Sequence, residues 1–223
     1  MHLVIKTSPG FSLIELMIGM MLGAFLLLGL VQSFATSLTA FRAVDRHYQL
    51  LQSGSHALGF IEYSIRDAGF PNLSSNDFPT AISADSFTEG NNDVLILEGW
   101  SRQNCFGNPN PQIDAEAQPA LFFRRQRFRL VDDSLRWLCD YGATRGTLVR
   151  QSNNQSLIDG VTGLRLDYHV DSNLDGSIDS SVRAGGWGQV ENIRQLQLTL
   201  KLESEDSYLQ RIYQTSIQLR NPG

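Results

Sequence analysis

The first apolar stretch of the chain is long enough to cross a membrane as a helix. Within Leu13–Val31 the only charged residue is Glu15, and Leu16–Val31 contains no polar side chain. A helix needs about 20 apolar residues to cross the hydrocarbon core of a bilayer. Lys6 precedes the stretch, and the first positive charge after it is Arg42. This asymmetry predicts a cytoplasmic N-terminus and an exported C-terminal part.

A second apolar pattern continues the helix beyond the membrane. Apolar side chains recur at helical spacings of three and four, with polar residues between them. The pattern predicts an amphipathic continuation that packs one stripe on a following domain. The helix is expected to end at Gly69-Phe70-Pro71, because a proline disfavours helical geometry in the residue before it. The stripe consists of Phe41, Val44, Tyr48, Leu51, Leu58, Ile61, Ile65 and Ala68, with Ser55 in its one gap.

Short strands are expected in the remainder of the chain. Residues 72–88 are rich in Ser, Asn, Asp and Pro and predict a loop. After this loop, runs of strand composition alternate with turn residues, and one pair predicts a hairpin across residues 132–134. We therefore predict an α+β fold in which one long helix packs against an antiparallel sheet. The expected strands are residues 93–98, 121–131, 135–139, 161–170, 193–202 and 212–219.

Composition narrows the class of protein. The 223 residues suffice for one globular domain plus an extra element, and 42% hydrophobic residues with 18% charged residues favour a folded chain. The formal charge of −5 argues against a general affinity for nucleic acid. No Ser-His-Asp arrangement, phosphate-binding loop or pair of catalytic carboxylates is recognisable in the sequence. We therefore do not expect an enzyme.

Three interpretations of the N-terminal stretch compete. An ordinary signal peptide would be cleaved after it, and Ser33-Phe34-Ala35 offers small residues at a suitable spacing. Such a cut would divide one periodic helix in two, which counts against it. A simple membrane anchor gives no reason for an acid near its start. The third interpretation takes residues 10–15 as one unit.

Gly10-Phe11-Ser12-Leu13-Ile14-Glu15 resembles the cleavage site of the type IV prepilin family. In that family a membrane peptidase cuts after the glycine and methylates the new N-terminal amine. The resemblance implies that Gly10 ends a leader and that Phe11 is the mature N-terminus. It also implies that Glu15 contacts the N-terminal amine of a neighbouring subunit. A carboxylate inside a membrane helix costs roughly 2.5–3.5 kcal/mol on insertion scales, so it usually has such a partner.

The order of the later elements is similar to that of the PilW-like minor pilins, which are related to the J-type pseudopilins of type II secretion. The segments Arg66–Phe70, Leu157–Val161 and Ile217–Asn221 carry this part of the resemblance. It implies a type IV pilin-like fold. The implied divisions are a leader over 1–10, a transmembrane helix over 11–32, an amphipathic helix over 33–69 and a periplasmic β-sheet domain over 70–223.

The resemblance also implies a role and a location. The chain would be a single-pass inner-membrane protein with a periplasmic C-terminal domain, and would later join a pilus or its tip. Its partners would be prepilin peptidase, the inner-membrane assembly platform, and other minor and major pilins. It would help to initiate type IV pilus assembly, with motility or adhesion downstream. The alternatives are a J-type pseudopilin of type II secretion and a calcium-dependent binding module at the fibre tip.

The two cysteines of the chain, Cys105 and Cys139, both lie in the C-terminal part. If that part is exported, they are expected to form a structural disulfide, since cytosolic thiols stay reduced. No Cys-x-x-Cys pair or Cys/His cluster indicates zinc.

Residues 171–179 combine oxygen-bearing side chains with a glycine, as in the first part of a calcium-binding loop. Gly176 permits a turn around a hard cation, but Val182 stands where such loops usually carry a bidentate acid. An Asp/Asn/Gly turn between two strands explains the same residues, so both interpretations stay open. Calcium is the one cofactor that the sequence suggests. The candidate ligands are Asp171, Asn173, Asp175, Ser177 and Asp179.

Residues 122–129 interleave arginines with aromatic residues, a pattern compatible with binding of single-stranded nucleic acid. On a strand, Arg125, Arg127 and Arg129 would share one face with Phe123. We interpret this face as a solvated strand surface. The acidic balance of the chain agrees, and no nucleic-acid partner is expected.

Overall fold

The computed structural model describes most of the chain, in two units that divide between Tyr48 and Gln49. One helix, α1 (Leu13–Asp67), contributes residues to both units. The predicted leader, apart from Gly10, and the predicted mature N-terminus Phe11 lie outside the described residues. The described residues are 10, 12–73, 76–83, 85–112, 120–150, 154–184, 192–204 and 209–219, with the side chain of Arg150 left out.

The described part of the first unit is the N-terminal portion of α1. Helix begins at Leu13 and continues without a break through the apolar stretch and the polar residues that follow it. By length and composition, α1 is the one helix among the described residues that could cross a membrane. The predicted transmembrane and amphipathic parts are therefore one helix, as the continuous periodicity indicated.

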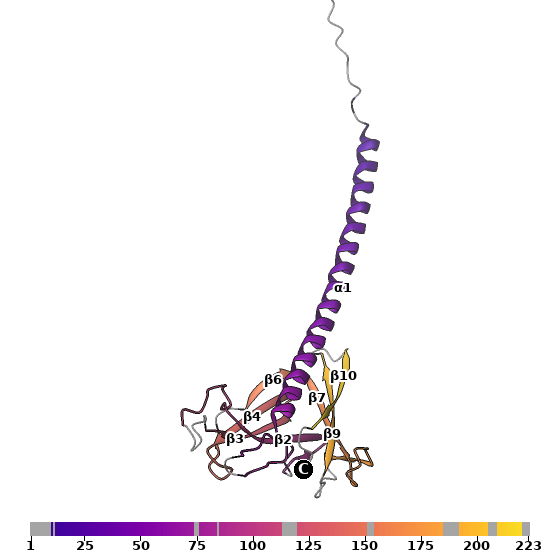
Figure 1. The fold of residues 1–223 in the computed structure, drawn as a ribbon. Helices are drawn as coiled ribbons and strands as arrows, with labels where there is room; N and C mark the ends of the chain where they lie inside the picture. The colour runs from indigo at the N-terminus through magenta and orange to yellow at the C-terminus, as the bar shows by residue number, and fades with distance from the viewer. Residues whose placement is uncertain are drawn as a thin grey trace, which may run out of the picture. The chain divides into compact units, whose positions relative to one another are not determined.

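The second unit contains two antiparallel sheets in its described part (Figure 1). The first sheet has the strand order β1-β2-β3-β4-β5, and β6 pairs with β4. Its hairpin between β3 and β4 turns at Asp132 and Asp133, which both have positive φ, as a two-residue type I′ turn requires. The strands are β1 (Phe87–Glu89), β2 (Asn92–Ser101), β3 (Phe122–Val131), β4 (Ser134–Gly142), β5 (Val149–Arg150) and β6 (Gln155–Asp159).

The second sheet has the strand order β10-β9-β7-β8. Its two central strands bury alternate residues, because one face lies on the core and the other does not. The buried leucines of β9 are the alternating ones that predicted this strand. The strands are β7 (Val161–Val170), β8 (Ser180–Arg183), β9 (Ile193–Glu203) and β10 (Gln210–Gln218).

The expected single sheet is thus two sheets, and Gly160 stands at the corner between them. It alone separates β6, which pairs with β4, from β7, which pairs with β9. Its φ is +75°, and a Cβ atom there would lie 2.6 Å from the carbonyl oxygen of Glu203. Only glycine fits this change of sheet without strain.

The C-terminal turns of α1 pack on the strands of the second unit (Figure 1). Ile61 is completely buried, in one apolar cluster with Phe128 of the first sheet and Tyr168 of the second. Burying an aliphatic or aromatic side chain of this size contributes roughly 1.5–3 kcal/mol. The helix therefore closes the core that the two sheets share.

The predicted apolar stripe of the helix is wrong in its first half. Phe41, Val44 and Tyr48 are 70%, 67% and 63% exposed. The buried line of the second unit instead includes the small residues Gly54 and Ala57. Small side chains let the helix approach the sheet closely, a reason for burial that a count of large apolar residues does not detect.

The two sheets meet where β2 begins. Asn92 Oδ1 accepts a hydrogen bond from the backbone N–H of Leu164 at 3.2 Å, and Asp93 Oδ2 accepts one from that of Leu166 at 2.7 Å. The Thr88 hydroxyl donates to the other oxygen of Asp93 at 2.7 Å. The buried carboxylate is thus paired on both sides, and it holds the edge of β7 against β2.

Candidate functional site

The described N-terminal segment begins with a capped helix. Ser12 precedes α1, and its backbone N–H donates to Oε2 of Glu15 at 3.0 Å. The N–H of Leu16 in turn donates to the carbonyl oxygen of Ser12 at 3.2 Å. An acid at this position satisfies an N–H group that the first turn leaves without a partner. Its negative charge also suits the positive end of the helix dipole.

The cap places the Glu15 carboxylate next to the predicted mature N-terminus. Oε2 lies 3.0 Å from the backbone nitrogen of Ser12, which directly follows Phe11 in the sequence. Oε1 has no hydrogen-bond partner among the residues that the structure describes. Glu15 can therefore accept a hydrogen bond from an amine through Oε1 while it keeps the cap through Oε2.

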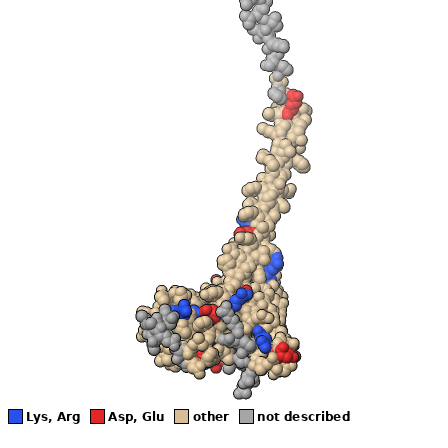
Figure 2. Space-filling view, in the orientation of Figure 1, with Lys and Arg blue, Asp and Glu red and all other residues tan. Residues whose placement is uncertain are grey.

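Behind this cap, α1 exposes a continuous apolar surface over residues 16–31, and the uncharged helix continues beyond it. No charged residue lies between Glu15 and Arg42, and Figure 2 shows this part of the helix in the colour of uncharged residues. Phe25 is 79% exposed and Met21 74%. Soluble proteins rarely expose a continuous apolar surface of this size, so the surface indicates a bilayer or other apolar helices around it.

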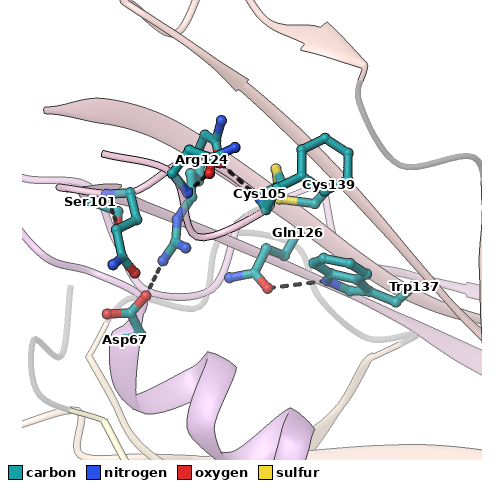
Figure 3. The surroundings of a disulfide bond; sticks show 11 residues. Asp67, Ser101, Cys105, Arg124, Gln126, Trp137 and Cys139 are labelled. Atoms are coloured by element: carbon teal, nitrogen blue, oxygen red, sulfur yellow. Dashed lines mark hydrogen bonds and ion pairs between the residues drawn. A yellow bond between two sulfur atoms is a disulfide. The ribbon is translucent and has the colours of Figure 1, made fainter. Parts of the chain in front are cut away.

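Cys105 and Cys139 form a disulfide, and they are the two cysteines that the sequence analysis paired (Figure 3). The bond ties the segment after β2 to β4, with the two Cα atoms 5.9 Å apart. Close to it, Arg124 of β3 forms an ion pair with Asp67, the last residue of α1. A covalent link and a charged contact therefore both fix this end of the second unit.

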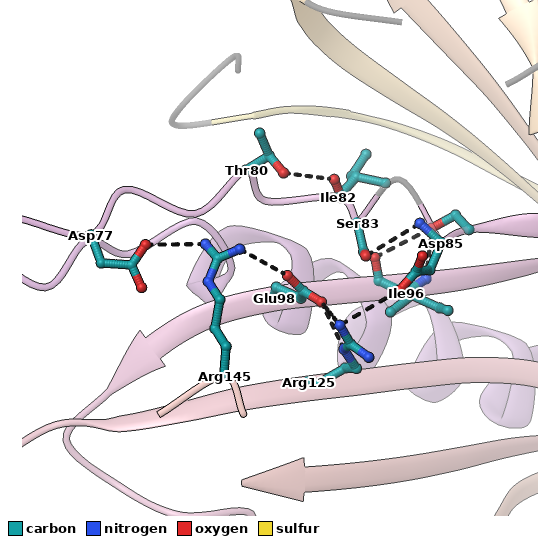
Figure 4. A network of polar contacts seen from close by, with 10 residues as sticks. Asp77, Thr80, Ile82, Ser83, Asp85, Ile96, Glu98, Arg125 and Arg145 are labelled. Atoms are coloured by element: carbon teal, nitrogen blue, oxygen red, sulfur yellow. Dashed lines mark hydrogen bonds and ion pairs between the residues drawn. The ribbon is translucent and has the colours of Figure 1, made fainter. Parts of the chain in front are cut away.

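A network of charged side chains surrounds Glu98 on β2 (Figure 4). Glu98 is 5% exposed and accepts a hydrogen bond from Arg125 Nε at 2.7 Å. On its other side Arg145 lies 3.8 Å away, and this arginine also binds Asp77 at 3.2 Å. The arginines compensate the buried carboxylate, and the contacts hold the segment that contains Asp77 against the sheet. This network is structural, and no local pattern in the sequence indicated it.

The loop over residues 171–179 is closed by its own backbone N–H groups. Asp171 is fully buried, and its carboxylate accepts hydrogen bonds from the N–H groups of Asp175 at 3.2 Å and Gly176 at 2.9 Å. Arg194 Nε donates to the same carboxylate at 2.9 Å. Asp179 Oδ2 accepts from the N–H of Ser172 at 2.8 Å. These are the contacts of a hydrogen-bonded Asp/Asn turn.

The other three candidate calcium ligands, Asn173, Asp175 and Ser177, take part in the same turn. The backbone N–H of Ser177 donates to Asp175 Oδ1 at 2.7 Å, and Asn173 Nδ2 donates to Asp175 Oδ2 at 3.1 Å. These two hydrogen bonds lower the pKa of Asp175, the one from Ser177 most. Within the described ranges, no group of three His, Cys, Asp or Glu side chains could hold a metal ion. Calcium binding stays a prediction.

Residues 5–31 match the family model described as the prokaryotic N-terminal methylation motif. No curated protein sequence matches the chain. Among solved structures, the chain is similar to a type IV-like pilin from Thermus thermophilus, at 10% sequence identity and a TM-score of 0.49 over 76% of this chain and 95% of that one. The residues that match the methylation motif include the Gly10-Phe11 junction and Glu15.

Proposed function

We propose that the chain is a minor pilin, a structural subunit that helps to initiate assembly of a type IV pilus used in motility or adhesion. The observation that carries the proposal is the methylation motif at residues 5–31, which includes the exposed apolar start of α1. A structural subunit needs a surface for its neighbours rather than a catalytic centre, and the exposed helix is such a surface. An enzyme is not part of the proposal.

Glu15 would direct the subunit into the assembly. Its carboxylate oxygen Oε1 is available while Oε2 keeps the helix cap, so the methylated amine of a neighbouring subunit can bind there. A cation beside this carboxylate would offset the roughly 2.5–3.5 kcal/mol that a charged acid costs within a membrane helix. The pairing would therefore be strongest where water is excluded, which is inside a bundle of apolar helices.

The location follows from the same features. The apolar part of α1 would cross the inner membrane once, with the short N-terminal end in the cytoplasm and the second unit in the periplasm. The Cys105–Cys139 disulfide supports this orientation, because such bonds persist in oxidising compartments. The partners would be prepilin peptidase, the assembly platform of the inner membrane, and other minor and major pilins.

Mass spectrometry of the mature protein tests the proposal. We expect a chain that starts at methylated Phe11. A chain that starts at Thr36, after the apolar stretch, would overturn it.

Two variants sharpen the experiment. The Gly10→Ala variant should remain unprocessed. Its fold should be unchanged, because nothing other than the neighbouring residues in the chain lies within 4 Å of a Cβ atom at this position. Glu15→Gln should be cleaved and methylated normally and yet fail to enter pili. Normal entry of Glu15→Gln into pili would contradict the role of the carboxylate.

A J-type pseudopilin of type II secretion is the alternative within the same chemistry. Its processing, membrane helix and Glu15 contact would be identical, so the N-terminus does not separate the two. Deletion of the gene does: loss of retractable surface pili with normal enzyme secretion supports the minor pilin, and the reverse pattern supports the pseudopilin.

A further inference from the structure

The arginines of the first sheet differ in their partners. Arg124 forms an ion pair with Asp67, and Arg125 forms ion pairs with Glu98 and Asp85. Arg127 and Arg129 follow on the same strand, and neither side chain forms a hydrogen bond or an ion pair with any described residue. Two arginines of β3 thus have ion pairs, and the next two have none among the described residues.

A third arginine lies directly beside this pair. Arg136 of β4 is the cross-strand partner of Arg129, and Arg127 lies two residues before Arg129 on the same face of β3. Neighbouring side chains on this face are on the order of 5–7 Å apart. Like charges placed directly opposite each other destabilise a sheet. The three residues are called the arginine face below.

Burial adds to this electrostatic cost. All three arginines are only partly exposed, and the Nε atom of each is buried without a hydrogen-bond partner. A buried donor left without an acceptor is unfavourable, and more so when it is charged. Arg136 is partly compensated: its Nη1 donates to the carbonyl oxygen of Asn154 at 3.4 Å.

Two acids, Asp159 and Asp140, lie near the arginine face. The pKa of Asp159 is lowered chiefly by hydrogen bonds from Ser134 and Ser156, with a smaller contribution from the charge of Arg136. Asp140 stands opposite Arg125 and is a diagonal neighbour of Arg127 on the same face. Arg127 and Arg129 nevertheless form no side-chain hydrogen bond or ion pair with any described residue.

We propose that the arginine face binds phosphate groups. A phosphate offers three acceptor oxygens and carries up to two charges, whereas a carboxylate offers two oxygens and one charge. Three adjacent guanidinium forks match the larger anion better. The aromatic side chain on the same face of β3, Phe123, is completely buried, so no base can stack on it. The contact is therefore to phosphate alone and has no sequence preference.

The inference revises the sequence-based interpretation of residues 122–129 as a solvated strand surface, and it is independent of the N-terminal segment. Free phosphate and the phosphodiester groups of a polymer share the recognised chemistry. The experiment therefore needs both probes, inorganic phosphate and a single-stranded DNA oligonucleotide.

The test uses the full chain in a neutral detergent. Fluorescence anisotropy of a labelled oligonucleotide should show binding that weakens as salt rises. Removing two contacts in Arg127→Gln/Arg129→Gln should reduce the slope of log K against log salt by about 1.4, at about 0.7 per phosphate on a single strand. Inorganic phosphate should raise the Tm of the unmodified chain and leave that of the double variant unchanged.

Two control variants show whether a loss of binding comes from the site itself, from the change in net charge or from misfolding. Arg165→Gln/Arg183→Gln removes the same charge from the second sheet and should bind the oligonucleotide as the unmodified chain does. Arg127→Lys/Arg129→Lys keeps the charge without the planar fork and should bind with intermediate affinity. Rescue by lysine also shows that the loss in the glutamine variant is not a folding defect.

The outcomes decide the proposal. A response to both probes supports a site for single phosphate groups, and binding of the oligonucleotide alone supports a polymer as the source. No response to either probe overturns the proposal, as does an equal loss in the second-sheet control. Competition by polyglutamate as strong as by the oligonucleotide would also overturn it, because the face would then select charge rather than phosphate.

Discussion

Tyr213 of β10 occupies the space that a side chain at Gly54 of α1 would need. A Cβ atom on Gly54 would lie 2.5 Å from two carbons of the Tyr213 ring. The hydroxyl of the same tyrosine donates a hydrogen bond to the carbonyl oxygen of Leu50 at 2.9 Å, so the ring cannot move aside without losing that bond. The ring of Tyr213, an edge-strand residue of the second sheet, thus packs directly on the backbone of α1 at Gly54.

This contact predicts opposite effects for two glycine-to-alanine changes in the same helix. Gly54→Ala should lower the free energy of unfolding by about 1–3 kcal/mol, the usual cost of overpacking a core. Gly59→Ala should raise it by about 1 kcal/mol, because alanine favours the helix and nothing lies within 4 Å of its added methyl group. Urea unfolding followed by tryptophan fluorescence measures both. A stabilised Gly54→Ala variant would contradict the contact.

The exposed half of the predicted stripe should serve assembly rather than folding. Phe41, Val44 and Tyr48 recur at helical spacing and are exposed. Phe41→Ser/Val44→Ser should leave the unfolding of the second unit unchanged and reduce incorporation into pili, as quantified on sheared fibres. Ile61→Ser is the matched control, since the same change at a fully buried site should destabilise the fold by several kcal/mol. Normal incorporation of the double serine variant would exclude this face from assembly.

Loss of the disulfide should weaken the second unit substantially. The bond joins residues 34 apart in the sequence, and closing a loop of that size is worth about 3–4 kcal/mol in the chain-entropy account. Cys105→Ser/Cys139→Ser should therefore unfold at a lower urea concentration. Reduction of the unmodified chain with a thiol reagent should produce the same decrease, and a variant as stable as the oxidised chain would show that the bond contributes little.

The second unit should lose stability in alkaline solution because of two tyrosines. Burial raises the pKa of Tyr168 and that of Tyr213. Above the ordinary tyrosine pKa of about 10, the unfolded chain releases these protons while the folded chain still holds them. The free energy of unfolding therefore falls as pH rises above about 10. Urea unfolding between pH 8 and 11 should show this decrease, and a smaller one for Tyr168→Phe. An unchanged pH dependence in that variant would exclude Tyr168 as a cause.

Calcium binding at residues 171–179 would have to compete with an internal cation. Arg194 already contacts the Asp171 carboxylate, so removing its charge should favour a metal ion. Millimolar calcium should raise the Tm of the unmodified chain slightly and that of Arg194→Gln more, with magnesium as the control. No shift in either protein would remove calcium from consideration.

Long periodic elements were predictable from the sequence, and short ones were not. The bounds expected for β7 agree with the structure, because apolar residues alternate without interruption from Leu164 to Val170. The strands β1, β5, β6 and β8 were missed, since each has five residues or fewer and little alternation to detect. Residues 87 and 88 belong to β1 although their composition predicted a loop, because pairing with β2 outweighs local propensity.

The N-terminal methylation motif was predictable because its residues are contiguous in the sequence. What the sequence did not indicate was the contact from Ser12 to Glu15, which gives the acid a second role as a helix cap. The network around Glu98 also escaped prediction. Its members Asp77 and Arg145 are 68 residues apart in the sequence, and only the folded sheet brings them together.

The side chains of Asn92 and Asp93 have a consequence for the solubility of the protein. A strand edge whose N–H groups have no hydrogen-bond partner can pair with a strand of another molecule, which leads to aggregation. At Leu164 and Leu166 of β7 those groups are already taken by an amide and a carboxylate oxygen. A strand of another molecule could pair with β7 at this point only by displacing the buried carboxylate of Asp93 from the N–H group of Leu166. Asn92 and Asp93 thus protect this edge of β7 from pairing with a strand of another molecule.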